Sequence, residues 1–567
     1  MGSYDIGISG FNAAQRALDI IGNNIANAAT EGYHRQEIDL KSKNEVLIGG
    51  FPVGQGVNFA RVVRVIDHLL DNEIVNQESS FSQISKELDT LKVMENAFGE
   101  LSTSGLSRAM DNFYDTLHYL SSDPNDANLQ HAVVTSAESL TYQFRSLGGV
   151  LNGIQDSIHA DAVKTVERIN LIASQISELN GEVSSAIARG MDPVNTLDHR
   201  DQLVTQLSRL TGVTVFKREN DSIDISLGNF SLVSGSTYSN MQLNLVGNGD
   251  SIDFSLSPAG STTVSISSIS GGQLGGLFSL RNDIVKDVQS QLDNVATTMM
   301  TDINKIHTQA VGSSGSFTTL TSQMMPDALS DFSPALGGTA AEEVIIRVTD
   351  SGGGVTTTVI NIDASATTTD TMTSIAAQFD AVANISSSID SAGKMVITAT
   401  GGAQFDFIPV SPVTTSDTIG FLAAVGLNTF FSGTNAETMT ITSFISGSGG
   451  IGRIASSGTT SMEDNEAILE MAKYGDTISS NFGGYTPKGY YRQIATSLGS
   501  TISASQLRYD NTNSILRSLN QRRDEISGVD MNNEASKMLL FERMFQGMAK
   551  YINIVTRTID TVMTIVN

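Results

Sequence analysis

Some residues have types and spacing that could support chemistry. Gly447, Gly449 and Gly452 fit the pattern G-x-G-x-x-G, in which glycines let a backbone approach a pyrophosphate. Such a loop must follow a strand and open a helix within a βαβ unit. No apolar helix pattern follows these glycines, and no βαβ pattern surrounds them. The sequence therefore predicts a flexible loop here and no nucleotide site.

Carboxylates and histidines are candidates for metal ligands. Asp221 and Asp224 lie close together, but the Gly and terminal Glu of a calcium loop are missing, which favours polar positions on a strand. No two of the seven histidines have the spacing of zinc ligands. For His199 and His307, which fall in helical segments, we expect surface or capping roles. No spacing pairs a nucleophile with a base. We expect no catalytic residue, no metal ligand and no cofactor, and hence a protein that is not an enzyme.

The composition argues against several other classes. The chain has 567 residues, with 60 Asp and Glu against 34 Lys and Arg, a formal net charge of −26. This charge repels phosphate backbones and anionic membranes, so we expect neither nucleic acid nor membrane as a partner. Cysteine is absent, which removes disulfides, thiolate metal sites and cysteine nucleophiles.

The sequence also lacks the patterns of a membrane span and of a cleaved secretory signal. No stretch approaches the roughly 20 apolar residues of a membrane span. Residues 1–15 lack the basic region and apolar core of a cleaved secretory signal. If the protein leaves the cell, we expect it to use another export route.

Hydrophobic spacing separates helical regions from strand-rich regions. Apolar residues recur at helical spacing from about 66 to 210, and the pattern resumes from 461 to the end. Alternating apolar and polar residues from 214 to 270 predict short antiparallel strands. A helix returns from about 273 to 310. Residues 318–460 are rich in Ser, Thr, Gly and Ala and predict an inserted β-rich domain, with strand candidates at 343–348, 356–362 and 394–400.

This order predicts an α+β multidomain fold in which the terminal segments belong together and β-rich domains are nested between them. The expected domains are a terminal coiled-coil assembly domain (1–65 with 525–567), a helical bundle (66–212 with 461–524), a β-rich domain with one long helix (213–317), and an inserted outer domain (318–460).

Both ends of the chain have the pattern of amphipathic helices. Near the start, one helical face carries Ile8, Phe11, Leu18, Ile21 and Ile25. At the end, apolar residues step by three and four, which is the seam of a coiled coil: Met538, Phe541, Phe545, Met548, Ile552, Val555, Ile559, Val562 and Val566. A seam is unsatisfied until it meets a partner. We therefore expect the two termini to join each other, and those of neighbouring molecules, whereas the stripes between 66 and 210 indicate an ordinary bundle interior.

One short segment is not explained by helical periodicity. Asn is a poor helix former, so the cluster at 23–27 suits a helix end, and a glycine at 32 permits a sharp turn. The segment resembles the N-terminal signature of the flagellar axial proteins, which are the rod, hook and hook-associated proteins. The residues that carry this resemblance include Asn23, Asn24, Asn27, Gly32, Tyr33, Arg35 and Gln36.

Three further segments are most similar to the family of hook-associated protein 1. Residues 197–203 (Leu-Asp-His-Arg-Asp-Gln-Leu) resemble its L-D-x-R-D-x-L stretch, and residues 271–277 (Gly-Gly-Gln-Leu-Gly-Gly-Leu) resemble a helix start that leads to Asn304 and His307. Residues 527–549 resemble its C-terminal signature. The resemblance covers about 1–310 and 465–567. It departs from the family pattern at Asn532 and Asn533, where acids are usual, and at Phe545, which replaces a Tyr.

The resemblance implies a structural subunit of the bacterial flagellum that joins hook to filament and supports motility. It implies a ring of identical subunits, with hook protein on one side and the second junction protein (hook-associated protein 3) and the filament on the other. It also implies an extracellular location reached by flagellar type III export, without a cleaved signal. The assembly interface would be the terminal residues named above. A cytoplasmic chaperone would cover one face of the last helix: Phe541, Phe545, Met548, Ile552, Val555 and Ile559.

Two alternatives remain open at this stage. A hook or distal rod protein shares the Asn-rich segment but usually lacks the 197–203 pattern. An exported adhesin or enzyme activity could reside in the β-rich, Ser/Thr-rich insert at 318–460. For the insert we favour a decorative or lattice-spacing role.

Overall fold

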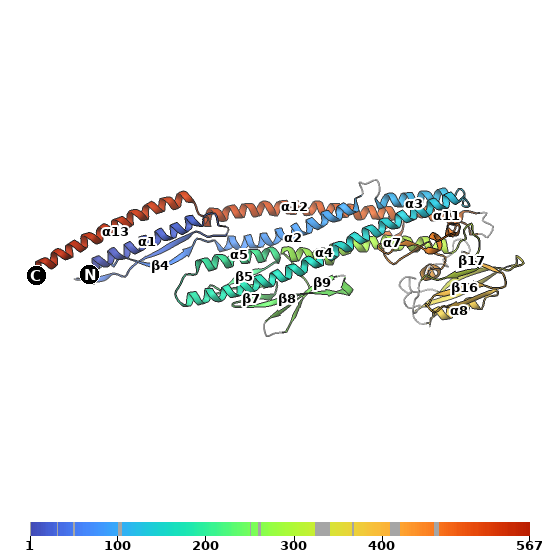
Figure 1. The fold of residues 1–567 in the computed structure, drawn as a ribbon, viewed down its shortest axis with the longest axis horizontal. Helices are drawn as coiled ribbons and strands as arrows, with labels where there is room; N and C mark the ends of the chain where they lie inside the picture. Colours follow the sequence, from blue (N-terminus) through green and yellow to red (C-terminus); the bar gives the residue numbers. More distant parts are fainter. Residues whose placement is uncertain are drawn as a thin grey trace. The chain divides into compact units, whose positions relative to one another are not determined.

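The computed structural model describes residues 2–30, 32–48, 51–99, 105–249, 251–258, 262–323, 341–365, 368–408, 420–458 and 464–566 (Figure 1). Contacts divide the chain into two compact units. Unit 1 contains 1–90, 156–284 and 503–567, and unit 2 contains 91–155 and 285–502. Three long helices contribute residues to both units: α2 (His68–Phe98), α4 (Ala127–Ala188) and α12 (Pro487–Ser527). No helix in the described ranges is long and apolar enough to cross a membrane.

Local sequence explains where the long helices begin. Asp67 accepts hydrogen bonds from the backbone N–H groups of Leu69 and Leu70 at 3.0 and 3.2 Å, which caps the start of α2. Asp530 accepts in the same way from residues 532 and 533 at the start of α13. α12 begins at Pro487, whose missing N–H costs nothing in the first turn.

Unit 1 combines the chain termini with a six-stranded antiparallel sheet. Its terminal elements are α1 (Gly2–Ala26), β1 (Gln36–Ser42), β2 (Val46–Ile48), β3 (Phe51–Val53), β4 (Val57–Arg64) and α13 (Met531–Val566). The sheet has the order β10-β9-β8-β7-β6-β5. Its strands are β5 (Thr214–Lys217), β6 (Ile223–Leu227), β7 (Phe230–Ser234), β8 (Thr237–Val246), β9 (Ser251–Pro258) and β10 (Val264–Ile266).

Helix α4 docks on this sheet through two asparagines. The Asn170 side chain donates to the Met241 carbonyl and accepts from its N–H, both at 2.8 Å. Asn180 does the same with Ile223, at 2.8 and 3.0 Å. Each side-chain amide thus pairs with both backbone groups of one strand residue, as a residue of a neighbouring strand would. Besides segments of α2, α4 and α12, the described residues of unit 1 form α5 (Val194–Leu210), α6 (Gly272–Ser279), a π-helical turn (Leu280–Ile284) and a short 3-10 helix (Gly247–Gly249).

Unit 2 contains a helical part and the inserted domain. Its helical elements are α3 (Leu106–Leu120), α7 (Val285–Thr308), α11 (Glu466–Tyr474) and the adjoining parts of α2, α4 and α12. The larger sheets of the insert have the orders β14-β13-β12-β17 and β11-β16-β15, and β18 (Phe431–Ser432) pairs with β19 (Thr440–Ile441). The strands of the larger sheets are β11 (Thr319–Thr321), β12 (Ala341–Thr349), β13 (Val355–Ser365), β14 (Thr368–Thr369), β15 (Ile385–Ile389), β16 (Met395–Ala399) and β17 (Gln404–Ile408).

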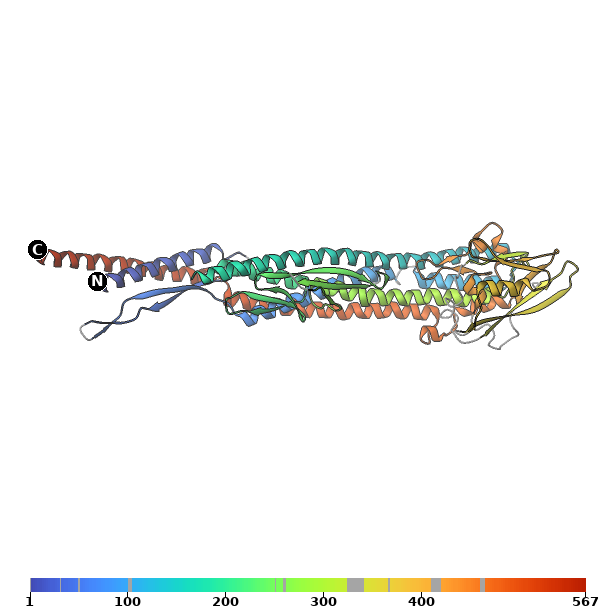
Figure 2. The same cartoon turned by 90° about the horizontal axis from the view of Figure 1, so that it is seen from below.

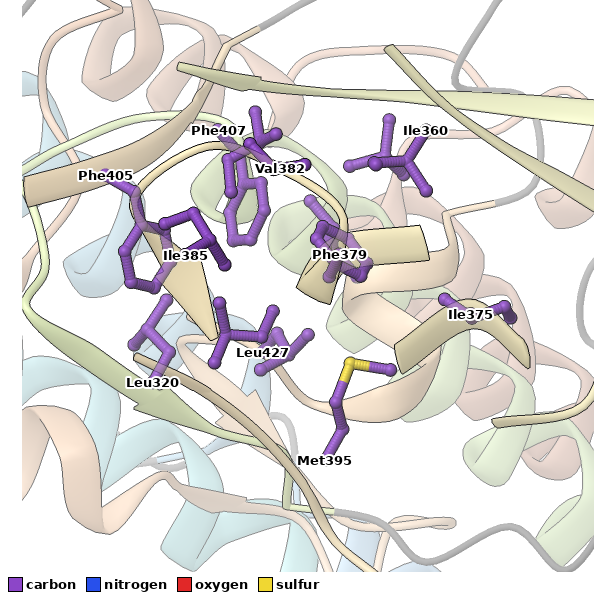
Figure 3. Packing of buried hydrophobic residues seen from close by; sticks show 14 of the residues in the cluster. Leu320, Ile360, Ile375, Phe379, Val382, Ile385, Met395, Phe405, Phe407 and Leu427 are labelled. Atoms are coloured by element: carbon purple, nitrogen blue, oxygen red, sulfur yellow. The ribbon is translucent and has the colours of Figure 1, made fainter. Parts of the chain in front are cut away.

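The insert has a dense apolar core of its own. Phe379, Met395 and Phe405 have no exposed surface, and Phe407 is 2% exposed. Figure 3 shows these side chains converging with aliphatic residues from the strands and α8 (Met372–Asp380). The Phe405 and Phe407 rings meet edge to face at 5.9 Å. This region therefore builds an apolar core within one chain.

The structure confirms the α+β multidomain fold and the pairing of the terminal helices. It also confirms the strand candidates, which fall in β12, β13 and β16, and the short antiparallel strands between 214 and 270. The helix expected at 273–310 is divided into α6, the π-helical turn and α7. Sequence patterns missed the antiparallel pair β1 and β4, and the helices within the insert: α8, α9 (Phe421–Val425) and α10 (Ser443–Ser446). The finer division into four domains stays a prediction.

Three local expectations were wrong. His307 lies in the core with no exposed surface, because its ring connects α7 to residues 428 and 455. Asp221 lies in a turn with φ of 56°, before β6 begins, although Asp224 is on the strand. The glycine pattern at 447–452 is not an open loop, because it enters a 3-10 helix at Gly450–Arg453.

Candidate assembly interface

Helices α1 and α13 lie side by side in unit 1 and run in opposite directions (Figures 1 and 2). The Phe11 and Phe545 rings are 4.3 Å apart between centroids. Asn24, near the end of α1, contacts Glu534, near the start of α13, at 2.9 Å. A Cβ atom added to Gly7 would lie 2.8 Å from Ile552 Cγ1. From residue 7 to residue 24 of α1, the contacting residue of α13 changes from 552 to 534, so the two helices are antiparallel.

The buried face of α1 differs from the face of large residues that the sequence indicated. Ile21 is buried, but Phe11, Leu18 and Ile25 are half-buried and Ile8 is 37% exposed. The buried positions are mostly occupied by small residues, because the backbones approach closely. A Cβ atom on Gly10 would lie 2.9 Å from Met548 Sδ. The residues of this face are Gly7, Gly10, Ala13, Ala14, Ala17, Ile21 and Asn24.

On α13, helix α1 covers only part of the apolar stripe. The first six members are half-buried: Met538, Phe541, Phe545, Met548, Ile552 and Val555. Beyond them, Ile559 and Val562 are 47% and 53% exposed. A second set of large apolar side chains on α13 is also exposed, including Leu539, Leu540 and Ile554 at 57–63%. This helix thus shows more apolar surface than a single chain covers.

The Asn-rich segment forms a closed hydrogen-bond network around Asn24. The Asn24 side chain donates to the Gln36 carbonyl and to Glu534 Oε2, both at 2.9 Å. It accepts from the Gln36 N–H at 3.0 Å and from the Tyr33 hydroxyl at 2.8 Å. These four bonds use the full capacity of the amide. Asn23 donates to the Tyr33 oxygen at 3.2 Å, and Asn27 donates to the Asn23 carbonyl at 2.9 Å. The network ties the end of α1 to β1 and α13.

The turn at 30–36 also brings two signature segments together. Gly32 has φ of +73°, and a Cβ atom there would lie 2.6 Å from Gln202 Cγ, so a turn that bends sharply against α5 needs glycine. His34 Nδ1 is 2.8 Å from Asp198 Oδ1, and Arg64 Nη1 donates to that oxygen at 2.8 Å. The segment at 197–203 therefore holds the Asn-rich segment in place.

Arg35 and Gln36 extend these contacts to the end of α12 and the start of α5. The Arg35 N–H donates to the Ser527 carbonyl at 2.8 Å, and its guanidinium donates to the Ile526 carbonyl at 3.3 Å. Gln36 Nε2 donates to Asn195 Oδ1 at 3.2 Å. The structure shows these contacts within the chain, and the role of these residues in an interface with other molecules stays a prediction.

Electrostatics around the network follow from burial. Burial, together with the Asp198 and Glu534 charges, raises the pKa of Tyr33 to about 12, so its hydroxyl remains a donor. A hydrogen bond from Lys537 lowers the pKa of Glu37, and the two groups are 2.8 Å apart. Glu534 has no exposed surface, and its other carboxylate oxygen lies 3.4 Å from Lys537 Nζ.

Sequence reasoning assigned no role in this site to Lys537 and Arg64, and it noted Glu534 only as part of the C-terminal signature. One signal was present for Glu534: it precedes Met538 by four residues and so continues the three-four stripe of α13. Arg64 gave no such signal, because its partner Asp198 lies 134 residues away. Lys537 follows Glu534 by three residues, but its shorter contact is with Glu37, 500 residues away.

A cavity of about 1570 Å³ adjoins this network in unit 1. Its lining carries both charge signs, including Arg35, Asp71, Arg209 and Arg523. Burial raises the pKa of Asp71. Across the described residues, no group of three or more His, Asp and Glu side chains is arranged to hold a metal ion. The contacts around the cavity join elements of the same unit.

The candidate interface therefore consists of paired termini, a polar turn held by α5 and an apolar stripe that α1 covers only in part. Two protein-family models match the chain. Residues 91–320 match the flagellar hook-associated protein FlgK helical domain, and residues 5–34 match the flagella basal body rod protein.

Individual relatives agree with these matches. Flagellar hook-associated protein 1 of Escherichia coli (strain K12) is 24% identical over 586 residues, covering 98% of both chains. The Salmonella typhimurium protein of that name is 28% identical over 316 residues, which span 54% of this chain and 57% of the relative. The chain thus aligns with little more than half the length of that relative.

A solved structure supports the fold. "The structure of the flagellar hook junction protein FlgK from Burkholderia pseudomallei" matches with a TM-score of 0.52 and 18% identity, covering 80% of this chain and 100% of that chain. The helical-domain model and the relatives together show that this chain is similar to flagellar hook-associated protein 1 (FlgK).

Proposed function

We propose that this protein is a structural subunit of the flagellar hook–filament junction, in which copies assemble through their terminal helices. The observation that carries the proposal is the stripe on α13, which continues past the reach of α1 with Ile559 and Val562 exposed. Neighbouring copies would bury this surface, because removing apolar area from water drives association. Contacts that continue from copy to copy build a ring or helical lattice rather than a closed pair.

The specific neighbours belong to the same proposal. We expect hook protein on one side of the ring, and hook-associated protein 3 and the filament on the other. Export would proceed in unfolded form through the flagellar type III apparatus. The absence of cysteine suits such a chain, because no crosslink can form before arrival.

A cytoplasmic chaperone would cover α13 before export. Its expected contact face includes Phe545, Met548 and Ile552, which in the folded chain lie against α1. Chaperone and α1 would therefore compete for one face. This competition would keep the terminal pair apart until the chaperone is released.

The named relatives are structural flagellar proteins, which favours a structural role over an enzymatic one. For the insert we propose a spacing or surface role, because its buried aromatic residues form an interior of its own. Removing residues 318–460 would test this role, since unchanged motility with lost adhesion would assign a separate binding activity to the insert.

Deletion of the gene tests the junction function. We expect negative-stain images to show hooks of normal length that carry no filament. Loss of the hook itself would instead assign the protein to the hook or distal rod. Normal filaments on the deletion strain would contradict the proposal, and complementation with the full chain controls for effects on neighbouring genes.

A further inference from the structure

The buried stripes of the two terminal helices share a spacing but differ in composition. On α1, the stripe steps by three and four through small residues to one polar end: Gly7, Gly10, Ala14, Ala17, Ile21 and Asn24. On α13, the stripe begins with a single acid and continues with large side chains: Glu534, Met538, Phe541, Phe545, Met548, Ile552 and Val555. Each stripe thus has one hydrogen-bonding side chain, and the two meet at 2.9 Å.

The apolar parts of these stripes do not select one alignment. Moving α13 by seven residues would place Ile559 against Gly7, where Ile552 now lies, and small residues would accept the new neighbour equally well. The slip would also cover Ile559 and Val562, which are 47% and 53% exposed. It would also uncover Met538, so apolar burial alone does not hold the native alignment.

The polar pair opposes this slip. Asn24 is 1% exposed and Glu534 is fully buried. In the slipped alignment, Asn24 would face Phe541 and lose its bond to the carboxylate. A buried amide without its partner is costly, and a single buried Asn at a seam position is known to fix the register of coiled coils.

We propose that the Asn24–Glu534 pair selects the register of α1 on α13. Lys537 extends the pair, since it lies 3.4 Å from Glu534 and 2.8 Å from Glu37 on β1. Asn24 itself bonds to both backbone groups of Gln36. These bonds fix the positions of both helices relative to β1. They therefore also fix which residue of α13 is the first that α1 leaves exposed. Asn24 and Glu534 act as positioning residues, and the role stands whether or not the junction function holds.

Cysteine pairs can report the register, because the chain has no cysteine of its own. The native reporter is Gly7→Cys with Ile552→Cys. A Cβ atom at residue 7 lies 2.8 Å from Ile552 Cγ1, so the two Cβ atoms are within about 4.3 Å, which a disulfide spans. The slipped reporter is Gly7→Cys with Ile559→Cys. Both are oxidised in the purified full-length chain at low concentration, and intramolecular crosslinks are counted by gel mobility and peptide mapping.

The variant Asn24→Asp places a second carboxylate beside Glu534 while keeping the side-chain shape. We expect the ratio of native to slipped crosslink to fall at least about tenfold. Adding Glu534→Gln restores a donor opposite the new carboxylate and should return most of that ratio. Asn12→Asp is the matched control, since it makes the same change at an exposed position of α1 outside this network, and its ratio should stay unchanged.

Three results would overturn the proposal. An unchanged ratio in Asn24→Asp would assign the register to the short connection between α12 and α13. A loss that Glu534→Gln does not restore would indicate general unfolding of the pair. An equal loss in Asn12→Asp would show that any added charge on this helix has the same effect.

Discussion

The inserted domain and the terminal helix pair use apolar residues in opposite ways. The insert buries Phe379, Phe405 and Phe407 almost completely against its own strands and helix (Figure 3). The terminal pair leaves its largest apolar side chains half-buried and exposes Ile554 and Ile559. The difference shows that the insert closes an apolar core within a single chain, whereas the terminal pair leaves apolar surface that we propose further copies cover. Substitutions should therefore act on stability in the insert and on assembly in the terminal pair.

The largest expected effect on stability is in the insert. Phe405→Ala removes a fully buried ring that contacts Phe317 and Phe407, and should destabilise the insert by about 3–5 kcal/mol. The matched change Phe545→Ala should cost only about 1–2 kcal/mol, because that ring is half-buried and its main aromatic contact is Phe11. Hydrogen exchange with mass spectrometry resolves each region in the intact chain. Equal losses would contradict the comparison.

A second effect depends on pH and concerns the helical part of unit 2. His307 Nδ1 donates to the Asn428 carbonyl at 2.7 Å, and Nε2 accepts from the Ala455 N–H at 3.0 Å, so the buried ring is neutral. Burial lowers the pKa of His307 to about 4 from its usual 6.5. The unfolded chain thus binds the proton more readily, and stability falls as pH drops from about 6.5 to about 4.

The full loss should be roughly 3 kcal/mol, since each pKa unit corresponds to about 1.4 kcal/mol. His307→Gln keeps a donor and an acceptor without titrating, so its unfolding free energy should depend less on pH in this range. Hydrogen exchange of α7 at several pH values, corrected for intrinsic exchange rates, gives the unfolding free energy of the native protein and of His307→Gln. Identical pH dependence in the two chains would rule out His307 as the source.

The smallest expected effect is at the rim of the terminal pair. Lys537→Met removes the ion pair with Glu37. Because the Glu37 side chain is 43% exposed, the free energy of unfolding should fall by less than about 1 kcal/mol. Lys537 lowers the pKa of Glu37, so its contribution is present above the unfolded pKa and is lost as pH falls through the folded one. Urea unfolding of the intact chain at neutral and acidic pH compares the variant with the native protein. A loss of several kcal/mol would mean that Lys537 mainly supports the buried Glu534.

Much of the fold could be predicted from the sequence, because periodicity records burial. The long helices, the strands at 214–270 and the stripe on α13 all follow from spacing. The buried face of α1 could not be predicted in this way, because glycine and alanine carry no hydrophobic signal. Helix α8 was hidden by the Ser/Thr-rich composition around it.

The candidate site was predicted in part, for a physical reason. The Asn-rich segment stood out because Asn and Gly are unusual at a helix end, but its partners did not. Glu534 and Asp198 contact it across 510 and 164 residues, and pairings of that length leave no local pattern. The segment therefore looked like an intermolecular surface, although the hydrogen bonds of Asn24 are made inside the chain.

The central claim is that neighbouring copies cover the stripe of α13 beyond α1, and a single substitution tests it most directly. Ile559→Asp leaves the contacts of Ile552 with α1 intact and places a charge on a side chain that is 47% exposed in the single chain. Asn553→Asp is the control, since it adds the same charge at an exposed polar position nearby.

Each variant replaces the native gene, and electron microscopy counts the hooks that carry a filament. The account predicts that Ile559→Asp is produced and folded but leaves hooks bare, whereas Asn553→Asp gives normal filaments. Normal filaments with Ile559→Asp would contradict it.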